Sequence, residues 1–432
     1  MATSITQPPS DAQNNQGLGP IVDEVDIRTM YTEEDYEVET RDGWTLVVTR
    51  YKPIKQPWNQ PIFGQPLMCV HGFSQNRFAW TAGQFAKNML YFGADLHFVE
   101  LRGHGKSSRR LQREKTEDTG RPLPTTFDFD WSLDDYFMYD LPAVIEAVKR
   151  VTGRAKVFYC GHSMGGMLGY GLASQRSDIA GLVTIGSPAD LGRESILLRV
   201  AAAAGSLLPL VGVGIRGLNA TRRAQHTALQ ASAKVLRSVP ALGSAAETLL
   251  ELEPPRNLRP KVVRMDLFLS GLYRAVQATD RTGEWIPKAL RIFNPDKHAS
   301  ADLEWVLTEG GEKEPIFVLQ QFIRWINHRE MKCYANGYDF KANFSRIQIP
   351  ITIIFGDEDV LAGVRSTRRI YNEVKSDYVV WRPVRGNSHL EITMGIDVRQ
   401  ICYDIKNLME FGIAHENRSP RLPRFRTESR IR

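Results

Sequence analysis

Ser163 lies in a five-residue pattern that can turn a serine into a nucleophile. The segment 161–165 reads Gly-His-Ser-Met-Gly, and it follows an apolar run at 156–160 and precedes a run with helical spacing from residue 167. A sharp strand-to-helix turn exposes the serine hydroxyl, and the flanking glycines let the neighbouring chain pass without Cβ clashes. The start of the helix directs amides and a positive dipole toward a reacting oxygen. We therefore expect Ser163 to attack an ester-like carbonyl, with an inert serine in a glycine-rich turn as the alternative.

A serine hydroxyl needs a base to take up its proton, and histidine most often serves. Of the nine histidines, His389 lies in a loop at 386–390, after a strand-like run at 378–384 and before the last helical pattern. We therefore predict that His389 is the base. Three other histidines at strand ends or beside the nucleophile are rivals: His71, His104 and His162. We expect structural hydrogen bonding from the first two, and the turn should direct the third away from the serine.

The imidazole in turn needs a carboxylate that fixes its tautomer and supports its charge. Three acidic residues follow the apolar run at 351–355. We predict that Asp359 is the acid, because it lies far enough past the strand to reach the loop of the base. Asp357 and Glu358 are weaker options, and Asp190, at the end of another predicted strand, is a rival.

The negative charge that develops on the carbonyl oxygen needs backbone amides as donors. One should be the amide of Met164, directly after the nucleophile. The other should come from the loop at 71–76, after the apolar run at 67–70, and we favour the amide of Phe73. Gly72 would let the backbone curl inward there.

The elements that must position these groups are short apolar runs separated by helical patterns. The runs lie at 36–40, 45–51, 67–70, 96–101, 156–160, 180–186, 349–356 and 378–384. The first two alternate apolar and polar residues and read as a hairpin. The others are typical of parallel strands joined by crossover helices, such as a helix over 133–151 that begins at Ser132. The chain is therefore predicted to be an α/β protein.

The pattern changes after Asp190, where helical periodicity continues with almost no strand signal. We accordingly divide the chain into four parts. These are a disordered leader at 1–33, a core at 34–190 and 346–413, a helical insertion at 191–345, and a basic, disordered tail at 414–432.

Taken together, these motifs resemble the α/β-hydrolase superfamily, and within it the serine lipase and esterase branch. The matching segments are VHGF at 70–73, ELRGHGKS at 100–107, GHSMGG at 161–166, GDED at 356–359 and GNSH at 386–389. The resemblance implies a mostly parallel, eight-stranded sheet flanked by helices, with a large helical cap inserted after the sixth strand. It also implies a catalytic triad of Ser163, Asp359 and His389, and an oxyanion hole formed by Phe73 and Met164. The serine departs from the epoxide hydrolases and haloalkane dehalogenases of this fold, which carry an aspartate there.

The insertion begins with an apolar stretch at 196–215, which contains one charge, Arg199, and is interrupted by Pro209. A membrane-spanning helix needs about 20 largely apolar residues. We therefore expect a lid over an apolar acyl pocket, with contact to a lipid surface as an alternative and a membrane span as a weaker one. For the tryptophans of the insertion, Trp285, Trp305 and Trp325, we expect core packing rather than pocket lining.

These features predict an enzyme that cleaves carboxylic esters with an apolar acyl chain, without a metal or cofactor. An acyltransferase, a thioesterase or a depolymerase with the same residues is the alternative, and a non-catalytic ligand receptor is a remote one. Of the net charge of +6, the tail from Glu416 contributes +4, from six arginines against two glutamates, so we expect no nucleic-acid partner. The four cysteines form no CxxC pair and are expected to be buried thiols. The N-terminus lacks the features of a secretory signal, so a cytoplasmic location is expected.

Overall fold

The protein is described here by a computed structural model. It describes residues 21–59, 61–195, 261–264, 266, 274, 292–297, 300–416 and 425–428, together with positions 199, 202, 224, 227, 230, 231 and 234. The apolar stretch at 196–215 and Trp285 therefore lie outside the described residues, apart from two positions of that stretch. Among the described residues, no helix is long and apolar enough to cross a membrane.

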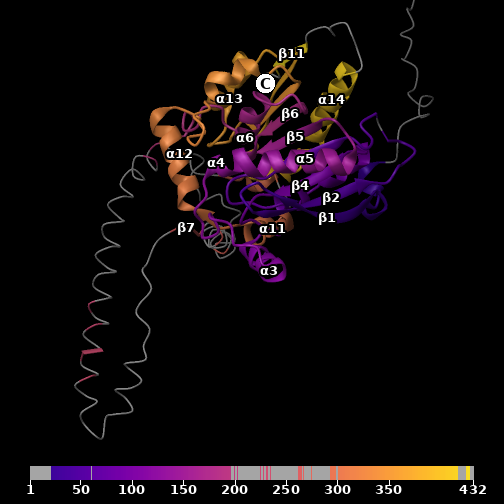
Figure 1. Ribbon diagram of the computed structural model, residues 1–432. Coiled ribbons are helices and arrows are strands. Elements are labelled where there is room, and N and C mark those ends of the chain that lie inside the picture. Colours follow the sequence, from indigo (N-terminus) through magenta and orange to yellow (C-terminus); the bar gives the residue numbers. More distant parts are fainter. Residues whose placement is uncertain are drawn as a thin grey trace, which may run out of the picture.

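A single large sheet forms the centre of the molecule (Figure 1). Its nine strands occur in the order β1-β2-β4-β3-β5-β6-β9-β10-β11. In chain order they are β1 (Tyr31–Glu39), β2 (Thr45–Pro53), β3 (Pro66–Val70), β4 (Asp95–Glu100), β5 (Val157–His162), β6 (Ile179–Ile185), β9 (Ile351–Gly356), β10 (Tyr378–Val384) and β11 (Phe425–Glu428). β2 runs antiparallel to both β1 and β4, and the other neighbours are parallel. The mostly parallel sheet predicted from the sequence is confirmed.

Helices cover both faces of this sheet. In β3, Met68 and Val70 join one buried apolar cluster, while Leu67 and Cys69 join another. A strand that is apolar on both faces is typical of a parallel sheet between two helical layers. One layer contains α5 (Leu141–Thr152), α6 (Met164–Ala173) and α13 (Val364–Glu373), and the other contains α1 (Phe78–Thr81), α2 (Phe85–Phe92) and α14 (Val398–Glu416).

The described residues near both ends of the chain contain more secondary structure than predicted. The helices η1 (Val22–Glu24) and η2 (Ile27–Thr29) and the start of β1 lie in the expected disordered leader. In the expected disordered tail, β11 pairs with β10 and adds a ninth strand to the predicted eight. Strand β10 would otherwise leave a row of unpaired backbone groups at the sheet edge, and Phe425 also stacks on Tyr378, with ring centroids 5.1 Å apart.

The predicted helix over 133–151 is present, but in three parts. Ser132 caps α4 (Leu133–Asp135) and forms a reciprocal capping box with Asp135. A π-helical turn, η3 (Tyr136–Asp140), then leads into α5. The turn ends at Asp140, whose buried carboxylate accepts hydrogen bonds from Arg102 in the loop after β4. The remaining helices outside the insertion are α3 (Arg109–Thr119) and η8 (Glu391–Thr393).

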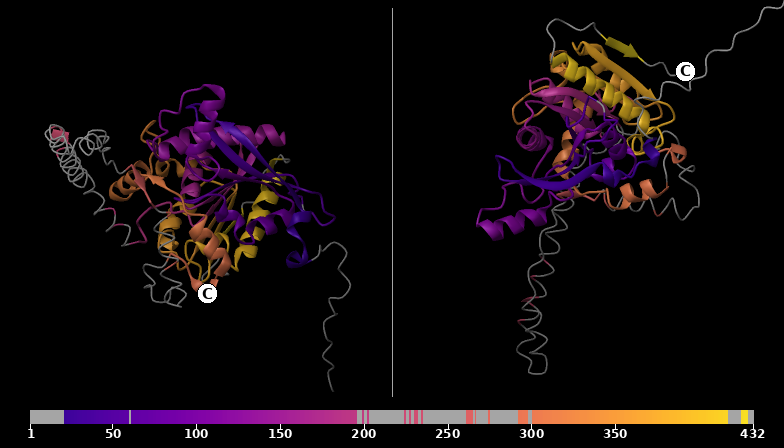
Figure 2. Two further views of the ribbon diagram at one scale, coloured as in Figure 1. Left: turned by 90° about the horizontal axis from the view of Figure 1, so that it is seen from below. Right: turned by 90° about the vertical axis from the view of Figure 1, so that its right-hand side faces the viewer.

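The chain leaves the large sheet after its sixth strand, β6, and returns to it at β9. The described elements between them are β7 (Val262–Val263), η6 (Pro295–Lys297), α11 (Ser300–Thr308), β8 (Glu314–Pro315), α12 (Ile316–His328) and η7 (Lys341–Arg346). β7 and β8 pair as a small antiparallel sheet. The sequence pattern predicted only helices in this segment. Figure 1 and the left view of Figure 2 show α12 beside the large sheet, on the side away from α14.

Two of the three tryptophans of the insertion are described. Trp325 is buried in the main apolar cluster and donates a hydrogen bond to the carbonyl of Lys332, so the expected packing role is confirmed. Trp305 is 49% exposed and packs edge-on against Phe78. All four cysteines are buried free thiols, as expected.

Candidate active site

Ser163 occupies the turn between β5 and α6. Its φ of 49° lies in the left-handed region that non-glycine residues rarely adopt. The glycines on either side allow this turn to pack tightly. A Cβ at Gly165 would lie 2.4 Å from the carbonyl oxygen of Val70, and one at Gly161 would lie 2.4 Å from the amide of Gly166. The strain is therefore concentrated at the one residue whose side chain is presented by the turn.

A chain of two hydrogen bonds links three of the predicted site residues. The Nε2 atom of His389 lies 2.9 Å from the hydroxyl of Ser163, and its Nδ1 atom lies 2.8 Å from Oδ2 of Asp359. The His389 and Asp359 side chains are almost fully buried. Such an arrangement allows the imidazole to accept the serine proton while the carboxylate fixes the opposite ring nitrogen as a donor.

The loop after β9 holds Asp359 firmly. Its second oxygen, Oδ1, accepts hydrogen bonds from the amides of Leu361 and Ala362, at 2.8 and 2.9 Å. The carboxylate of Asp357 instead accepts from the amide of Gly386. Of the acidic residues in this loop, Asp359 is therefore the one bonded to His389.

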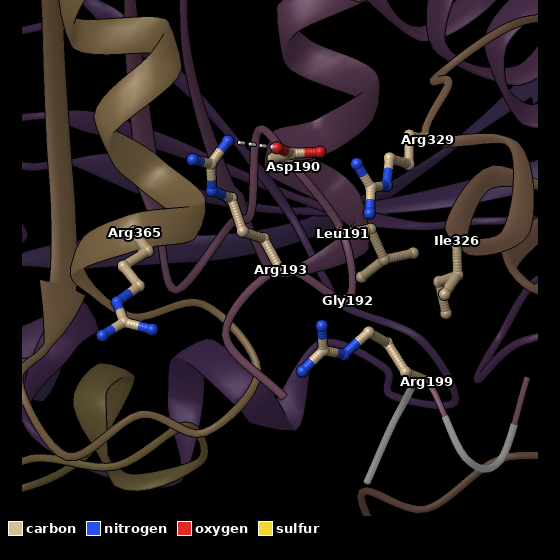
Figure 3. Close-up of a pocket in the computed structure, with 8 residues that line it drawn as sticks. All are labelled: Asp190, Leu191, Gly192, Arg193, Arg199, Ile326, Arg329 and Arg365. Carbon is tan, nitrogen blue, oxygen red and sulfur yellow. Dashed lines mark hydrogen bonds and ion pairs between the residues drawn. The ribbon is translucent and has the colours of Figure 1, made fainter. Parts of the chain in front are cut away.

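Asp190, the rival acid, has different partners. Its carboxylate lies 2.7 Å from the ammonium of Lys341 and 3.1 Å from Arg193, as Figure 3 shows for the second contact. Burial raises the pKa of Asp190, but these two cations outweigh it and hold the pKa below its usual value. Asp190 thus forms a structural ion pair in this arrangement rather than supporting the imidazole.

The rival histidines also have other contacts. His71 accepts a hydrogen bond from the amide of Leu101, and burial and the neighbouring His104 lower its pKa well below the usual value. The Nε2 atom of His162 lies 3.0 Å from the carbonyl oxygen of His389, and its Nδ1 atom lies 2.8 Å from Oε1 of Gln75. Burial and the neighbouring His389 lower the pKa of His162 to about 3. Neither ring contacts the hydroxyl of Ser163.

Opposing effects set the basicity of His389. Burial disfavours the charged imidazole, but the charge and hydrogen bond of Asp359 outweigh it and raise the pKa of His389 above 6.5. The negative charge of Glu391 also raises the pKa of His389. Burial raises the pKa of Glu391 itself to about 7, although its carboxylate accepts a hydrogen bond from the amide of Ser388.

The two predicted oxyanion donors lie beside Ser163. Phe73 lines the same cavity as the serine, and Met164 follows the serine in the chain. Among the described residues, no acceptor receives a hydrogen bond from either amide. Gly72 is tightly placed, since a Cβ there would lie 3.0 Å from Cβ of Ser163. The loop after β3 thus brings its backbone against the nucleophile.

A cavity of about 140 Å³ opens above Ser163. Apart from Ser163, His389, His162 and the loop after β3, its lining is chiefly aliphatic: Ile292, Val306, Leu307, Leu361 and Leu390. The first three belong to the segment between β6 and β9. The carbonyl of Ile292 also accepts hydrogen bonds from the amides of His389 and Leu390, so this segment both lines the cavity and supports the histidine loop.

A second network, which sequence reasoning missed, connects the same segment to the loop after β3. The buried carboxylate of Glu314 accepts hydrogen bonds from the amide of Ser74 at 2.7 Å and from Nε2 of His104 at 3.0 Å. The other ring nitrogen of His104 faces the carbonyl of Arg102. Both nitrogens therefore face acceptors, which requires a charged imidazole. Burial lowers the pKa of His104, but Glu314 raises it to about 9.

Neither Gln75 nor Glu314 was proposed for the site from the sequence. Gln75 lies in the loop identified for the oxyanion donors, where its Oε1 accepts from the amide of Gly72, so the loop itself was a usable signal. Glu314 had no such signal, because 240 positions separate it from Ser74. The described residues contain no cluster of three or more histidine, cysteine or acidic side chains suited to a metal ion.

Parts of this chain are similar to known proteins. A family described as "alpha/beta hydrolase fold" matches residues 65–204. A tear acid lipase-like protein of Mesocricetus auratus is 28% identical over 151 residues, which cover 35% of this chain and 37% of that protein. The human lysosomal acid lipase/cholesteryl ester hydrolase is 27% identical over 152 residues, which cover 35% and 37%. The match thus spans little more than a third of the length of these relatives.

Among solved structures, that of DcsB in complex with its substrate analogue is similar to this chain. It has a TM-score of 0.50 and 11% sequence identity, and the alignment covers 88% of this chain and all of that one. At this identity the likeness concerns the fold. Together with the family match, it agrees with the sheet and the helical layers described above.

Proposed function

We propose that this chain, which belongs to the α/β-hydrolase superfamily, is a serine hydrolase that cleaves carboxylic esters. The observation that carries the proposal is the continuous pair of hydrogen bonds from Ser163 through His389 to Asp359, at 2.9 and 2.8 Å. A ligand receptor with this fold would not need a strained serine aligned with a buried base and acid.

In the proposed reaction, the hydroxyl of Ser163 attacks the ester carbonyl while Nε2 of His389 takes up its proton. The carbonyl oxygen becomes negatively charged and accepts hydrogen bonds from the amides of Phe73 and Met164. When the tetrahedral intermediate collapses, the carbon–oxygen bond to the alcohol breaks and His389 protonates the leaving alcohol. Water then attacks the acyl-enzyme by the same route, which releases the carboxylic acid and restores the serine.

The lining of the cavity supports an apolar acyl group as the part of the substrate nearest Ser163. Burial of apolar substrate surface against aliphatic side chains contributes a favourable free energy of roughly 25 cal/mol per Å². The volume of about 140 Å³ is close to that of a cavity that holds a benzene molecule, roughly 150 Å³. The described residues thus provide room for a short acyl group or the first part of a longer chain.

The chemistry can be tested by labelling with a fluorophosphonate, which reacts covalently with an activated serine. We expect the wild-type chain to be labelled and the Ser163→Ala variant not to be labelled. Ser187→Ala is a matched control, because this serine is buried near α6 but does not contact His389. Absence of labelling in the folded wild type, or equal labelling of Ser163→Ala, would contradict the proposal.

Acyl preference can be measured with nitrophenyl esters of increasing chain length. We expect kcat/KM to rise beyond the acetate ester, because each methylene buried in the cavity contributes about 0.8 kcal/mol. Val306→Asn should weaken this dependence on chain length, since it places a polar amide in the aliphatic lining. An optimum at acetate would exclude an apolar acyl pocket.

A further inference from the structure

A second, larger pocket lies where the chain leaves the large sheet after β6 (Figure 3). It has a volume of about 470 Å³, within the range of small-molecule sites, and shares no lining residue with the cavity above Ser163. Four of its eight described lining residues are arginines: Arg193, Arg199, Arg329 and Arg365. They come from the segment after β6, from the end of α12 and from the start of α13. We call this the arginine pocket.

The positive charge of the arginine pocket is poorly balanced. Asp190 is the one acidic residue among its lining residues, and its carboxylate already pairs with the nearly buried Lys341 and with Arg193. No described carboxylate forms an ion pair with the side chain of Arg199, Arg329 or Arg365. The side chains of these three arginines thus border one pocket without a described ion pair, and the one further carboxylate nearby, that of Glu194, accepts from the backbone amide of Arg365 rather than from its guanidinium group.

The directions of the side chains show where this positive charge is concentrated. In Figure 3 the guanidinium groups of Arg199 and Arg329 extend toward the same space from opposite sides, near Leu191 and Gly192. Arg193 turns toward Asp190, and Arg365 lies at the far side. Two like charges that point into one pocket repel each other unless an anion lies between them.

The backbone conformation around this space also indicates a binding site. Arg329 has a φ of 53° at the C-terminal end of α12, where glycine or asparagine usually stands. A non-glycine residue is strained in this conformation, yet the chain places a long cation here, directed into the pocket. Gly192, with a φ of 80°, packs against Ile326, since a Cβ there would lie 2.9 Å from its side chain. Gly192 therefore adds no side chain to the space between Arg199 and Arg329, which leaves Leu191 as its apolar neighbour there.

We propose that the arginine pocket binds a phosphate group carried by a larger molecule. Guanidinium groups bind phosphate with paired, charge-assisted hydrogen bonds, and a tetrahedral anion offers oxygens to donors that approach from several sides. The pocket volume leaves room for the molecule that carries the phosphate. Two sources share this chemistry, a soluble phosphate monoester and the headgroup of an anionic phospholipid.

Binding can be measured on the full chain by calorimetric titration with glycerol 3-phosphate and by co-sedimentation with vesicles. The vesicles contain phosphatidylcholine alone or phosphatidylcholine with one-fifth phosphatidic acid. The test variant is Arg199→Gln/Arg329→Asn, in which asparagine suits the left-handed position. The matched control is Arg110→Gln/Arg324→Gln, which removes two arginines that are well exposed elsewhere, with 86% and 58% of their side chains accessible.

We expect the test variant to lose at least about 100-fold in affinity, because it removes two charge-assisted donors to the phosphate. The control should change affinity by less than about threefold. If the test variant loses binding to glycerol 3-phosphate, the ligand is a soluble phosphate monoester. If it loses only the binding to the vesicles that contain phosphatidic acid, the ligand is a lipid headgroup. If neither ligand binds, or if both double variants weaken binding equally, the proposal is wrong. Circular dichroism confirms folding, and fluorophosphonate labelling of Ser163 reports separately on the proposed hydrolase.

Discussion

At the scale of single residues, two aspartates at strand ends have different environments. Asp359 receives two loop amides on one oxygen and the imidazole of His389 on the other. Asp190 receives the ammonium of Lys341 and the guanidinium of Arg193. The sequence favoured Asp359 for its position past the strand but left Asp190 as a rival, because both follow an apolar run. Side-chain direction and partner charge, which depend on the folded loops, distinguish them.

Asp359→Asn should lower kcat by about 10⁴ while leaving the fold intact, as the equivalent change does in a serine protease. The amide places a donor where Nδ1 of His389 requires an acceptor, which favours the wrong imidazole tautomer. Steady-state hydrolysis of a nitrophenyl ester measures this loss. A variant that keeps more than about a tenth of the wild-type kcat would show that another carboxylate supports the base.

Asp190→Asn is the companion variant and should behave in the opposite way. Removing this carboxylate leaves the nearly buried ammonium of Lys341 without its partner, which should lower the free energy of unfolding by about 3–5 kcal/mol. The kcat of the folded fraction should stay within about threefold of wild type, because Asp190 does not contact His389. Urea unfolding and active-site titration with a fluorophosphonate separate the two effects. Full stability combined with lost activity would reverse the assignments.

At the scale of elements, features formed by residues close together in the sequence could be predicted. Features that depend on residues far apart in the sequence could not. The turn at Ser163 depends on a strand, two glycines and a helix within about 20 consecutive residues, so the sequence pattern contains nearly all of it. Strand β11 was missed because four residues in an arginine-rich tail have no strand signal until the edge of β10 offers them backbone partners. Glu314 was missed because its partners, Ser74 and His104, lie far away in the sequence.

Glu314 joins β8 to the loop that presents the Phe73 amide, so Glu314→Gln should affect both stability and catalysis. His104 would lose its buried counter-charge, which should lower the free energy of unfolding by about 3–5 kcal/mol below pH 6.5. Displacement of the loop should lower kcat by up to about 10²-fold with little change in KM. Denaturant unfolding and steady-state kinetics measure these changes.

The matched variant is Glu309→Gln, which changes an exposed carboxylate in the same segment whose backbone carbonyl, not its side chain, contacts Asn76. It should leave stability within about 0.5 kcal/mol of wild type. Equal behaviour of the two glutamine variants would mean that the Glu314–His104 pair does not hold the loop.

At the scale of the whole molecule, pH acts on stability through the same buried pair. The folded-state pKa of His104 is about 9, against 6.5 for an unperturbed histidine. A raised pKa means that the stabilising contribution is complete below pH 6.5 and is lost as the pH rises through 9. We therefore expect the free energy of unfolding of the wild type to fall over this range. The fall should be smaller in Glu314→Gln, and denaturant unfolding at the two ends of the range compares them.

Activity should change with pH in the opposite direction. The base His389 must be neutral to accept the serine proton, and Asp359 raises its pKa above 6.5. The kcat/KM for ester hydrolysis should therefore increase as the pH rises through the pKa of the free enzyme, while the stabilising contribution of His104 declines toward pH 9.

In Asp359→Asn the residual activity should reach half its maximum at a lower pH, because the amide no longer stabilises the imidazolium. A pH profile of kcat/KM for both proteins tests this, and a midpoint in the wild type below that of the variant would contradict the role of Asp359.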